Sequence, residues 1–220
     1  MKRFAITALA AIVCLCSCMD TETILYRGSM FGTINGPGIM LGDDSHVYHF
    51  RNYTDWENFP ASGRVVAIFD VYKLMDGTQN DYDAKILSIA VPLCKDPVIC
   101  ETPEEDEALG DDPLAMYDGY FSGGYLNLLC GALLSESSTV EHKVNLQIVP
   151  GENADTLHTV MRHNAGTDKV TEINSEFYSA RSFYACFPLE DQLPADKSVV
   201  LEIKWLWDGE WHTAYTEIKK

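Results

Sequence analysis

Basic residues are scarce in this chain of 220 residues. Lysine and arginine together number 16, against 33 aspartate and glutamate residues, and the formal net charge is −17. A surface this acidic repels the phosphates of nucleic acids and the head groups of anionic lipids. The sequence also has no basic stripe with interleaved aromatic residues, so we expect no nucleic-acid partner.

The signature motifs of common enzyme classes are missing as well. The sequence contains no G-x-S-x-G elbow, no P-loop, no H-E-x-x-H and no G-x-G-x-x-G. Hydrophobic residues nevertheless make up 46% of the chain, which is enough to form a folded core. We therefore expect a folded protein that is not an enzyme and that holds no cofactor and no metal.

Only one long apolar run occurs, and it lies at the start of the chain. Lys2 and Arg3 precede the apolar segment 4–13, which is too short for a stable membrane span and is typical of a signal peptide. The following L-C-S-C resembles the bacterial lipobox and predicts lipid attachment at Cys18, the plain secretory signal being the alternative. Cys16 fits less well, because a large Leu15 stands where the lipobox has a small residue.

Residues 1–17 are thus predicted to be a lipoprotein signal peptide, and 18–28 a tether after the lipid anchor. The mature protein would then contact the membrane through its N-terminal lipid. Asp20 and Glu22 follow the anchor at once, and such early acidic residues resemble the export signal of Bacteroidetes surface lipoproteins. We expect an outer-membrane lipoprotein exposed on the cell surface, with the periplasmic face as the alternative.

Cleavage before Cys18 leaves four cysteines for the folded part. An exported protein can form disulfides. Cys94 and Cys100 flank a short loop with a proline turn signal, and the alternatives for them are a local bridge and two free thiols. Cys130 and Cys186 lie in strand-like runs, where each is as well explained by a buried thiol as by a bridge. No C-x-x-C pair remains to support a zinc ribbon.

An acidic stretch divides the chain into two blocks. Residues 101–112 hold seven acids and no base, which predicts a solvated linker or exposed loop. Residues 29–100 contain about five short strand patterns, and Arg64–Met75 is the clearest of them. That number favours a small OB-type β-barrel.

Residues 113–220 again show mainly strand patterns. About seven strands in this length predict an immunoglobulin-like β-sandwich, and Asp208-Gly209 predicts a hairpin turn. The expected fold class is therefore all-β, a small barrel followed by a sandwich. The clearest strand patterns of the second block are 125–134, 142–149, 177–187, 199–207 and 211–218, with a single helical turn at 189–193.

Several segments together resemble the NigD-like lipoproteins of Bacteroidetes. They are G-D-D-S-H-V-Y at 42–48, S-G-R-V-V at 62–66, G-D-D-P-L at 110–114, G-G-Y-L-N-L at 123–128, H-K-V-N-L at 142–146 and M-R-H-N-A-G-T-D at 161–168. The resemblance implies an N-terminal OB-type domain, a C-terminal β-sandwich and a place in the cell envelope. It also implies an association with bacteriocins, for which an immunity role has been suggested in the family.

The R-H-N-A segment with its following aspartate is the most specific part of this resemblance. We interpret Arg162, His163, Asn164 and Asp168 as a structural motif that holds a tight turn between sandwich strands. A cross-strand metal site that uses His142 with His163 is the alternative. The pairs His46/His49 and His158/His163 have odd spacings, which place their members on opposite faces of a regular strand.

Three functional hypotheses remain open. The first is a surface-anchored interaction protein that binds a protein partner, for example a cationic bacteriocin attracted by the acidic surface. The second is a lipoprotein that binds or processes glycans, in which Trp205, Trp207 and Trp211 would form a platform rather than core. The third is a structural component of the envelope.

Overall fold

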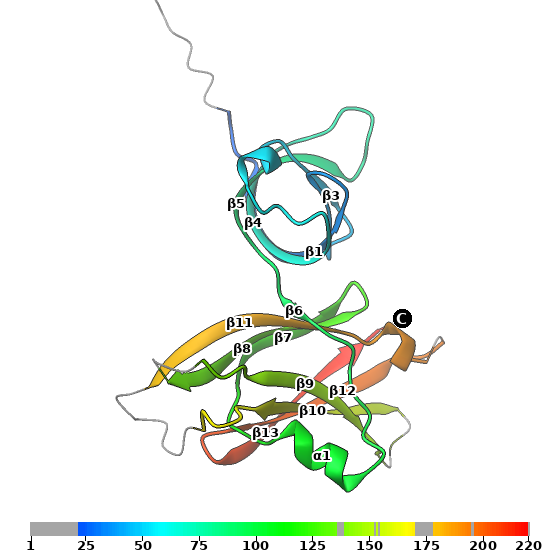
Figure 1. Cartoon of the computed structure of the whole chain (residues 1–220). Helices are drawn as coiled ribbons and strands as arrows, with labels where there is room; N and C mark the ends of the chain where they lie inside the picture. Colours follow the sequence, from blue (N-terminus) through cyan, green and yellow to red (C-terminus); the bar gives the residue numbers. More distant parts are fainter. Residues whose placement is uncertain are drawn as a thin grey trace, which may run out of the picture.

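A computed structural model describes residues 22–135, 139–151, 153, 155–169, 178–194 and 196–219. Figure 1 shows a small barrel above a β-sandwich, joined by a single connecting stretch of chain. This arrangement confirms the predicted all-β fold of a barrel followed by a sandwich. The predicted signal peptide 1–17 and the predicted lipid site Cys18 lie outside the described residues.

Five strands close the barrel in the order β1-β2-β3-β5-β4. They are β1 (Tyr26–Asn35), β2 (Ile39–Gly42), β3 (Val47–Phe50), β4 (Ser62–Leu74) and β5 (Asp81–Ala90), with the short 3-10 helix η1 (Tyr53–Asp55) between β3 and β4. The parallel pair β3–β5 completes the ring, and the other neighbours are antiparallel. Strand β1 begins inside the range predicted for the tether.

Strand β4 shows why its sequence is apolar on both faces. Val65, Ala67 and Phe69 point into the barrel and are fully buried, together with the core residues Ile34, Met40, Tyr48, Phe50, Val71, Ala84 and Ile86. Val66 points the other way and is buried against the sandwich. One face of this strand therefore serves the barrel core and part of the other serves the contact between the domains.

The sandwich consists of two four-stranded sheets, ordered β13-β12-β10-β9 and β6-β11-β8-β7. Their strands are β6 (Leu93–Cys94), β7 (Ala115–Ser122), β8 (Tyr125–Ser135), β9 (Lys143–Val149), β10 (Thr156–Asn164), β11 (Tyr178–Pro188), β12 (Val199–Trp207) and β13 (Glu210–Ile218), with a 3-10 turn η2 (Glu190–Gln192). A core that includes Leu128, Leu146 and Leu201 fills the space between the sheets.

Two features of the connection differ from the sequence-based expectation. Strand β6 lies within the range predicted for the barrel, but it pairs in parallel with β11 of the sandwich. The stretch 101–112, predicted as a solvated linker or loop, contains the helix α1 (Pro103–Leu109). A capping box between Thr102 and Glu105 and a proline at the first helical position offset the repulsion of its acids.

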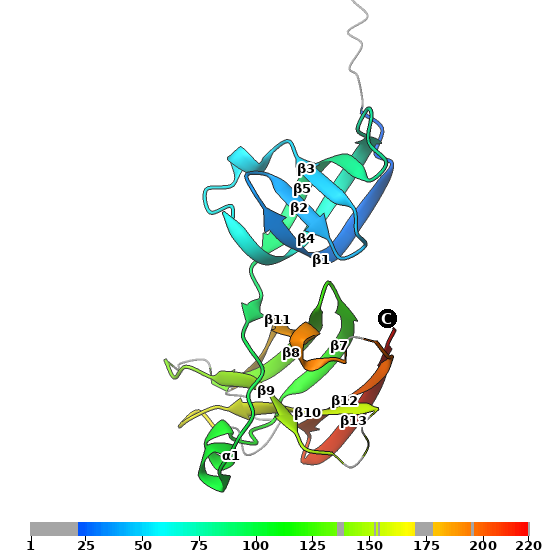
Figure 2. The same cartoon turned by 90° about the vertical axis from the view of Figure 1, so that its right-hand side faces the viewer.

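The barrel and the sandwich meet through a small apolar contact. Phe31 of β1 and Val66 of β4 are buried with Cys186 of β11, and Tyr125 and Tyr184 pack around them. Figure 2 shows β1 and β4 at the end of the barrel that faces the hairpin of β7 and β8. Within the described ranges, no helix is long and apolar enough to cross a membrane.

Candidate functional site

The predicted R-H-N-A motif lies at the end of β10 and binds the acidic stretch. Arg162 donates to the Asp106 carbonyl oxygen at 2.8 Å and forms an ion pair with Asp111 at 3.0 Å. Its side chain is only 9% exposed. The motif therefore does more than hold its own turn, because it fixes α1 and the residues after it against the sheet.

Asn164 and its neighbours complete this attachment. The Asn164 amide donates to the Ala108 carbonyl oxygen at 3.0 Å, and its side-chain oxygen accepts from the Gly166 amide at 2.9 Å. The Ala165 amide donates to the Asp112 carboxylate at 2.8 Å. The segments G-D-D-P-L and R-H-N-A, which carry the family resemblance, thus lie directly against each other.

A buried chain of hydrogen bonds links His163 to His142 and Asp168. His163 Nδ1 donates to the Pro113 carbonyl oxygen at 2.9 Å, and its Nε2 lies 3.0 Å from His142 Nδ1. His142 Nε2 lies 3.0 Å from an Asp168 carboxylate oxygen, which also accepts from the Ser135 amide. The fold therefore brings together the two histidines considered as a cross-strand site.

The orientation of the His163 ring is fixed by its bonds. Because a carbonyl only accepts, the proton of the neutral His163 ring lies on Nδ1, and Nε2 presents its lone pair to His142. Burial lowers the pKa of His163, and the nearby His142 lowers it further against the raising effect of the Pro113 carbonyl.

This buried junction has no room for a substrate. The cavity beside His163 and Asp168 measures about 10 Å³, which is at most the space of one water molecule. Among the described residues, no group of three or more His, Cys, Asp or Glu side chains is arranged to hold a metal ion. The geometry thus favours the structural interpretation of Arg162, His163, Asn164 and Asp168.

A second polar cluster joins the two domains, and the sequence analysis missed it. Arg64 of β4 binds the Asp43 carboxylate with both terminal nitrogens, at 2.7 and 2.8 Å, and donates to the Asn127 side chain at 2.7 Å. The Ser122 hydroxyl also donates to Asp43. Both Arg64 and Asp43 are almost fully buried. The segments G-D-D-S-H and S-G-R were visible in the sequence, but their mutual contact was not.

The four described cysteines Cys94, Cys100, Cys130 and Cys186 are all free thiols. The Cys94–Cys100 bridge is therefore not formed in this structure. Cys130 and Cys186 are fully buried, as expected for thiols in core strands. Burial raises the pKa of the Cys130 thiol to about 12, so it carries no nucleophilic thiolate near neutral pH.

An open concave surface lies on the barrel. A cavity of about 580 Å³ is lined by Pro37, Gly38, Ile39, His49, Phe50, Arg51, Tyr53, Lys73, Met75, Asp76 and Asp83. A second cavity of about 280 Å³ is lined by Pro37, Tyr53, Thr54, Trp56, Glu57, Phe59, Pro60 and Ala61. The two share Pro37 and Tyr53, and we call them together the barrel groove.

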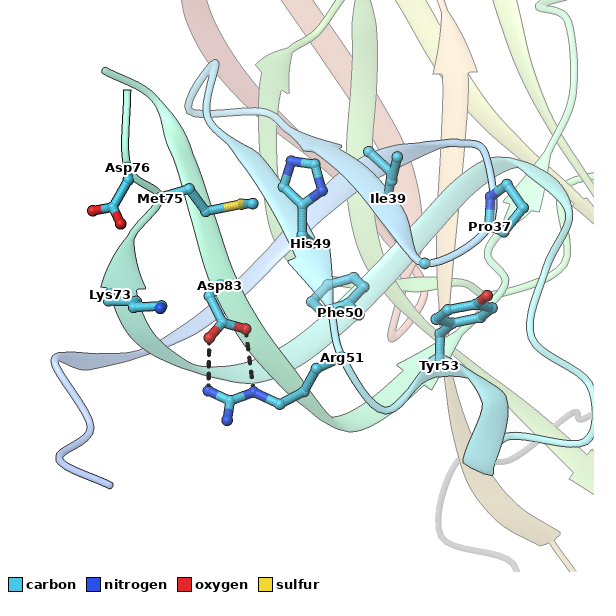
Figure 3. A pocket seen from close by; sticks show the side chains of 11 residues that line it. Pro37, Ile39, His49, Phe50, Arg51, Tyr53, Lys73, Met75, Asp76 and Asp83 are labelled. Atoms are coloured by element: carbon cyan, nitrogen blue, oxygen red, sulfur yellow. Dashed lines mark hydrogen bonds and ion pairs between the residues drawn. The ribbon is translucent and has the colours of Figure 1, made fainter. Parts of the chain in front are cut away.

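Among the charged side chains of the barrel groove, Figure 3 shows Arg51 bound to Asp83. Arg51 binds Asp83 at 3.0 Å and Glu22 at 2.6 Å, and its guanidinium lies 4.1 Å from the centre of the Tyr72 ring. His49 pairs with Asp81 at 3.2 Å. The guanidinium of Arg51, just after β3, is thus already neutralised by acids, whereas Asp76 in the first cavity and Glu57 in the second are exposed.

The tryptophans at the last hairpin have different environments. Trp205 packs against the sandwich core, and its ring stacks on His212 with 5.4 Å between centroids. Trp211 is 52% exposed on the outer face of the sheet. A shared platform of Trp205, Trp207 and Trp211 is therefore not supported, and the half-buried aromatic residues of the barrel groove are the better candidates for ligand contact.

The comparisons with known proteins agree with this fold. Residues 97–217 match a family model described as the NigD-like C-terminal beta sandwich domain. Comparison with curated proteins gives no match. Strand β6 lies just before the matched range, and the barrel lies outside it.

Several solved structures share the whole architecture. A protein of Parabacteroides distasonis, provisionally described as toxin-related, is 20% identical with a TM-score of 0.66, over 88% of this chain and 94% of its own. A NigD-like immunity protein of Bacteroides caccae is 16% identical with a TM-score of 0.59, over 88% and 96%. A protein of unknown function from Bacteroides vulgatus is 16% identical with a TM-score of 0.67, over 89% and 92%. At these identities the likeness establishes the fold.

Proposed function

Because the chain belongs to the NigD-like family, we propose that it is a non-catalytic interaction protein of the cell envelope, anchored by a lipid at Cys18. In this proposal the barrel groove binds an extended, cationic segment of a protein partner. The observation that carries it is the groove itself, which combines apolar residues with the exposed carboxylates of Asp76 and Glu57.

The composition of the barrel groove fits such a segment. Pro37, Ile39 and Tyr53 offer apolar contact area along its length. Since Arg51 is paired with Glu22 and Asp83, the exposed Asp76 and Glu57 dominate the charge of the groove, although the exposed Lys73 reduces it. The net charge of −17 adds a long-range attraction for a cationic partner.

The relatives favour a toxin as that partner. The Bacteroides caccae protein is described as an immunity protein, and the Parabacteroides distasonis protein provisionally as toxin-related. A bacteriocin bound at the cell surface before it reaches its target would be neutralised without any catalytic step. Deletion of the gene should then raise sensitivity to a co-encoded bacteriocin, and unchanged sensitivity to every co-encoded toxin would contradict this version.

The direct test uses the full-length protein in detergent and a displayed library of random peptides. We expect enrichment of extended peptides that combine lysine or arginine with apolar residues. The charge reversals Asp76→Lys and Glu57→Lys should each weaken binding of the enriched peptides about tenfold, which corresponds to about 1.4 kcal/mol. Glu210→Lys is the matched control, because it makes the same charge change at an exposed site on β13.

Glycan binding is the second candidate, supported by one observation. Tyr53, Trp56 and Phe59 lie together along the second cavity, and aromatic faces of this kind can stack against sugar rings. A glycan array with the same full-length protein distinguishes the glycan proposal from the protein-partner proposal. Glycan signal lost on Asp76→Lys, together with no peptide enrichment, would replace the protein-partner proposal with the glycan one.

A further inference from the structure

Cys94 and Cys186 stand directly opposite each other in the sandwich. They are paired residues of the parallel strands β6 and β11, and the Lys95 amide donates to the Cys186 carbonyl oxygen at 3.3 Å. Opposed residues of a strand pair point to the same face, with their Cα atoms about 4.8 Å apart. That separation lies within the range of about 4.4–6.8 Å that a disulfide can span.

The two thiols also contact each other. Their side chains are hydrogen-bonded, and the contact with Cys94 and burial both raise the pKa of Cys186. Cys186 is fully buried, whereas Cys94 is exposed at the edge of the sheet. An external oxidant can therefore reach one sulfur of the pair, and that sulfur touches the other.

The path of the chain separates Cys94 from Cys100, which is the cysteine nearest to it in the sequence. After β6 the chain leaves the sheet that contains β6 and β11. Val98 then hydrogen-bonds to Leu146 and Ile148 of β9, in the other sheet. Figure 2 shows this segment running from β6 past β9 to α1. A bond to Cys100 would have to disturb either the pairing of Cys94 or the attachment of Val98.

We propose that Cys94 and Cys186 form a disulfide that fixes the interdomain connection to β11. The electrons go to a disulfide-containing oxidant, such as an envelope dithiol oxidoreductase or oxidised glutathione. The Cys94 thiolate attacks one sulfur of the oxidant and releases the other as a thiolate. The Cys186 thiol then loses its proton as its sulfur attacks the Cys94 sulfur and releases the second oxidant thiolate, so two protein thiols lose two protons and two electrons in total.

The position of this bond gives it a structural consequence. Cys186 belongs to the buried contact between the domains, with Phe31 and Val66 of the barrel. The bond would hold the connecting chain beside this contact and would close a long loop of the sandwich in the unfolded state. The lipoprotein export expected from residues 1–17 would bring the pair into a compartment where disulfides persist.

The test uses the full-length protein, extracted without reductant, exposed to oxidised glutathione and only then treated with an alkylating agent. Peptide mass spectrometry of the unreduced digest should show the Cys94 and Cys186 peptides linked. Reduction should lower the midpoint of thermal unfolding by about 5–10 °C, since a disulfide that closes so long a loop stabilises the fold considerably.

Two variants make the result specific. Cys94→Ser should remove the effect of reductant on the unfolding midpoint, and it is expected to fold because Cys94 is at the exposed edge. Cys100→Ser is the matched control. It should retain both the linked Cys94–Cys186 peptide and the effect of reductant on the unfolding midpoint. A Cys94–Cys100 peptide, or alkylation of both Cys94 and Cys186 after oxidation, would overturn the proposal.

Discussion

Asp43 and Arg64 are joined by two hydrogen bonds of 2.7 and 2.8 Å, and this buried pair is the polar centre of the contact between barrel and sandwich. Asn127 and Ser122 from the sandwich bind the same two side chains. An isolated charge in this contact would be costly, because the surrounding protein excludes water. The pair therefore fixes how the two domains meet.

We expect Arg64→Met to lower the free energy of unfolding by about 3–5 kcal/mol, since it leaves the Asp43 carboxylate buried without its partner. Urea unfolding of the full chain measures this loss. Lys219→Met is the matched control, because Lys219 pairs with Glu217 and both side chains are exposed, at 77% and 57%, so its loss should stay below about 1 kcal/mol. Equal losses in the two variants would contradict the importance of burial.

The second prediction concerns acid. The pKa of His163 is lowered in the folded protein by burial, so the unfolded chain binds a proton first as the pH falls. The contribution of His163 to stability is complete above about pH 6.5 and is lost below it. Its nearest titratable neighbours are His142 and Asp112.

Two measurements check this direction. The His163 ring should titrate by NMR with a midpoint below that of a histidine in the unfolded chain, about 6.5. Unfolding free energies at pH 7.5 and 5.5 should differ more in the wild type than in His163→Gln. A midpoint at or above the unfolded value would show that the contacts with the Pro113 carbonyl and with Asp112 outweigh burial.

The third prediction concerns the start of α1. Thr102 accepts a hydrogen bond from the Glu105 amide at 3.2 Å, and Glu105 accepts from the Thr102 amide in return. Thr102→Ala should lower the free energy of unfolding by about 1 kcal/mol, while Thr102→Ser should retain most of the stability. Denaturant unfolding of the two variants compares them directly. Equal stability of both variants would mean that Arg162 alone holds the helix in place.

The barrel shows how far the sequence predicts this fold. In β4 the apolar run around Val65, Ala67 and Phe69 predicts a strand that is apolar on both faces, and the structure buries these residues and Val66. Alternation with period two found Val144, Leu146 and Ile148 in β9. Regular burial of apolar residues is a local property, so the local pattern was sufficient.

Strand β10 and helix α1 were missed for one physical reason. The end of β10 carries Arg162, His163 and Asn164, which are polar and look like a turn, and α1 carries acids that look like a solvated loop. The polar groups of the two elements bind each other although they are far apart in the sequence. The hydrogen bond from Arg162 to Asp106, for example, spans 56 residues. The capping pattern T-P-E-E at 102–105 was the local signal that could have revealed the helix.

The last prediction tests how closely this attachment is packed, and it concerns Gly110. Gly110 has a φ of +75°, and a Cβ placed there would lie 2.7 Å from the His163 carbonyl oxygen. Gly110→Ala therefore meets both backbone strain and a contact with main chain that has little freedom to move. Gly77→Ala is the matched control, because Gly77 has a φ of +81° and open space around the same position. Both variants carry the strain of about 1–3 kcal/mol, so the additional loss of unfolding free energy in Gly110→Ala measures the contact alone. If the two losses are equal, the segment after α1 can shift away from β10, and the R-H-N-A motif holds it less tightly than the hydrogen bonds indicate.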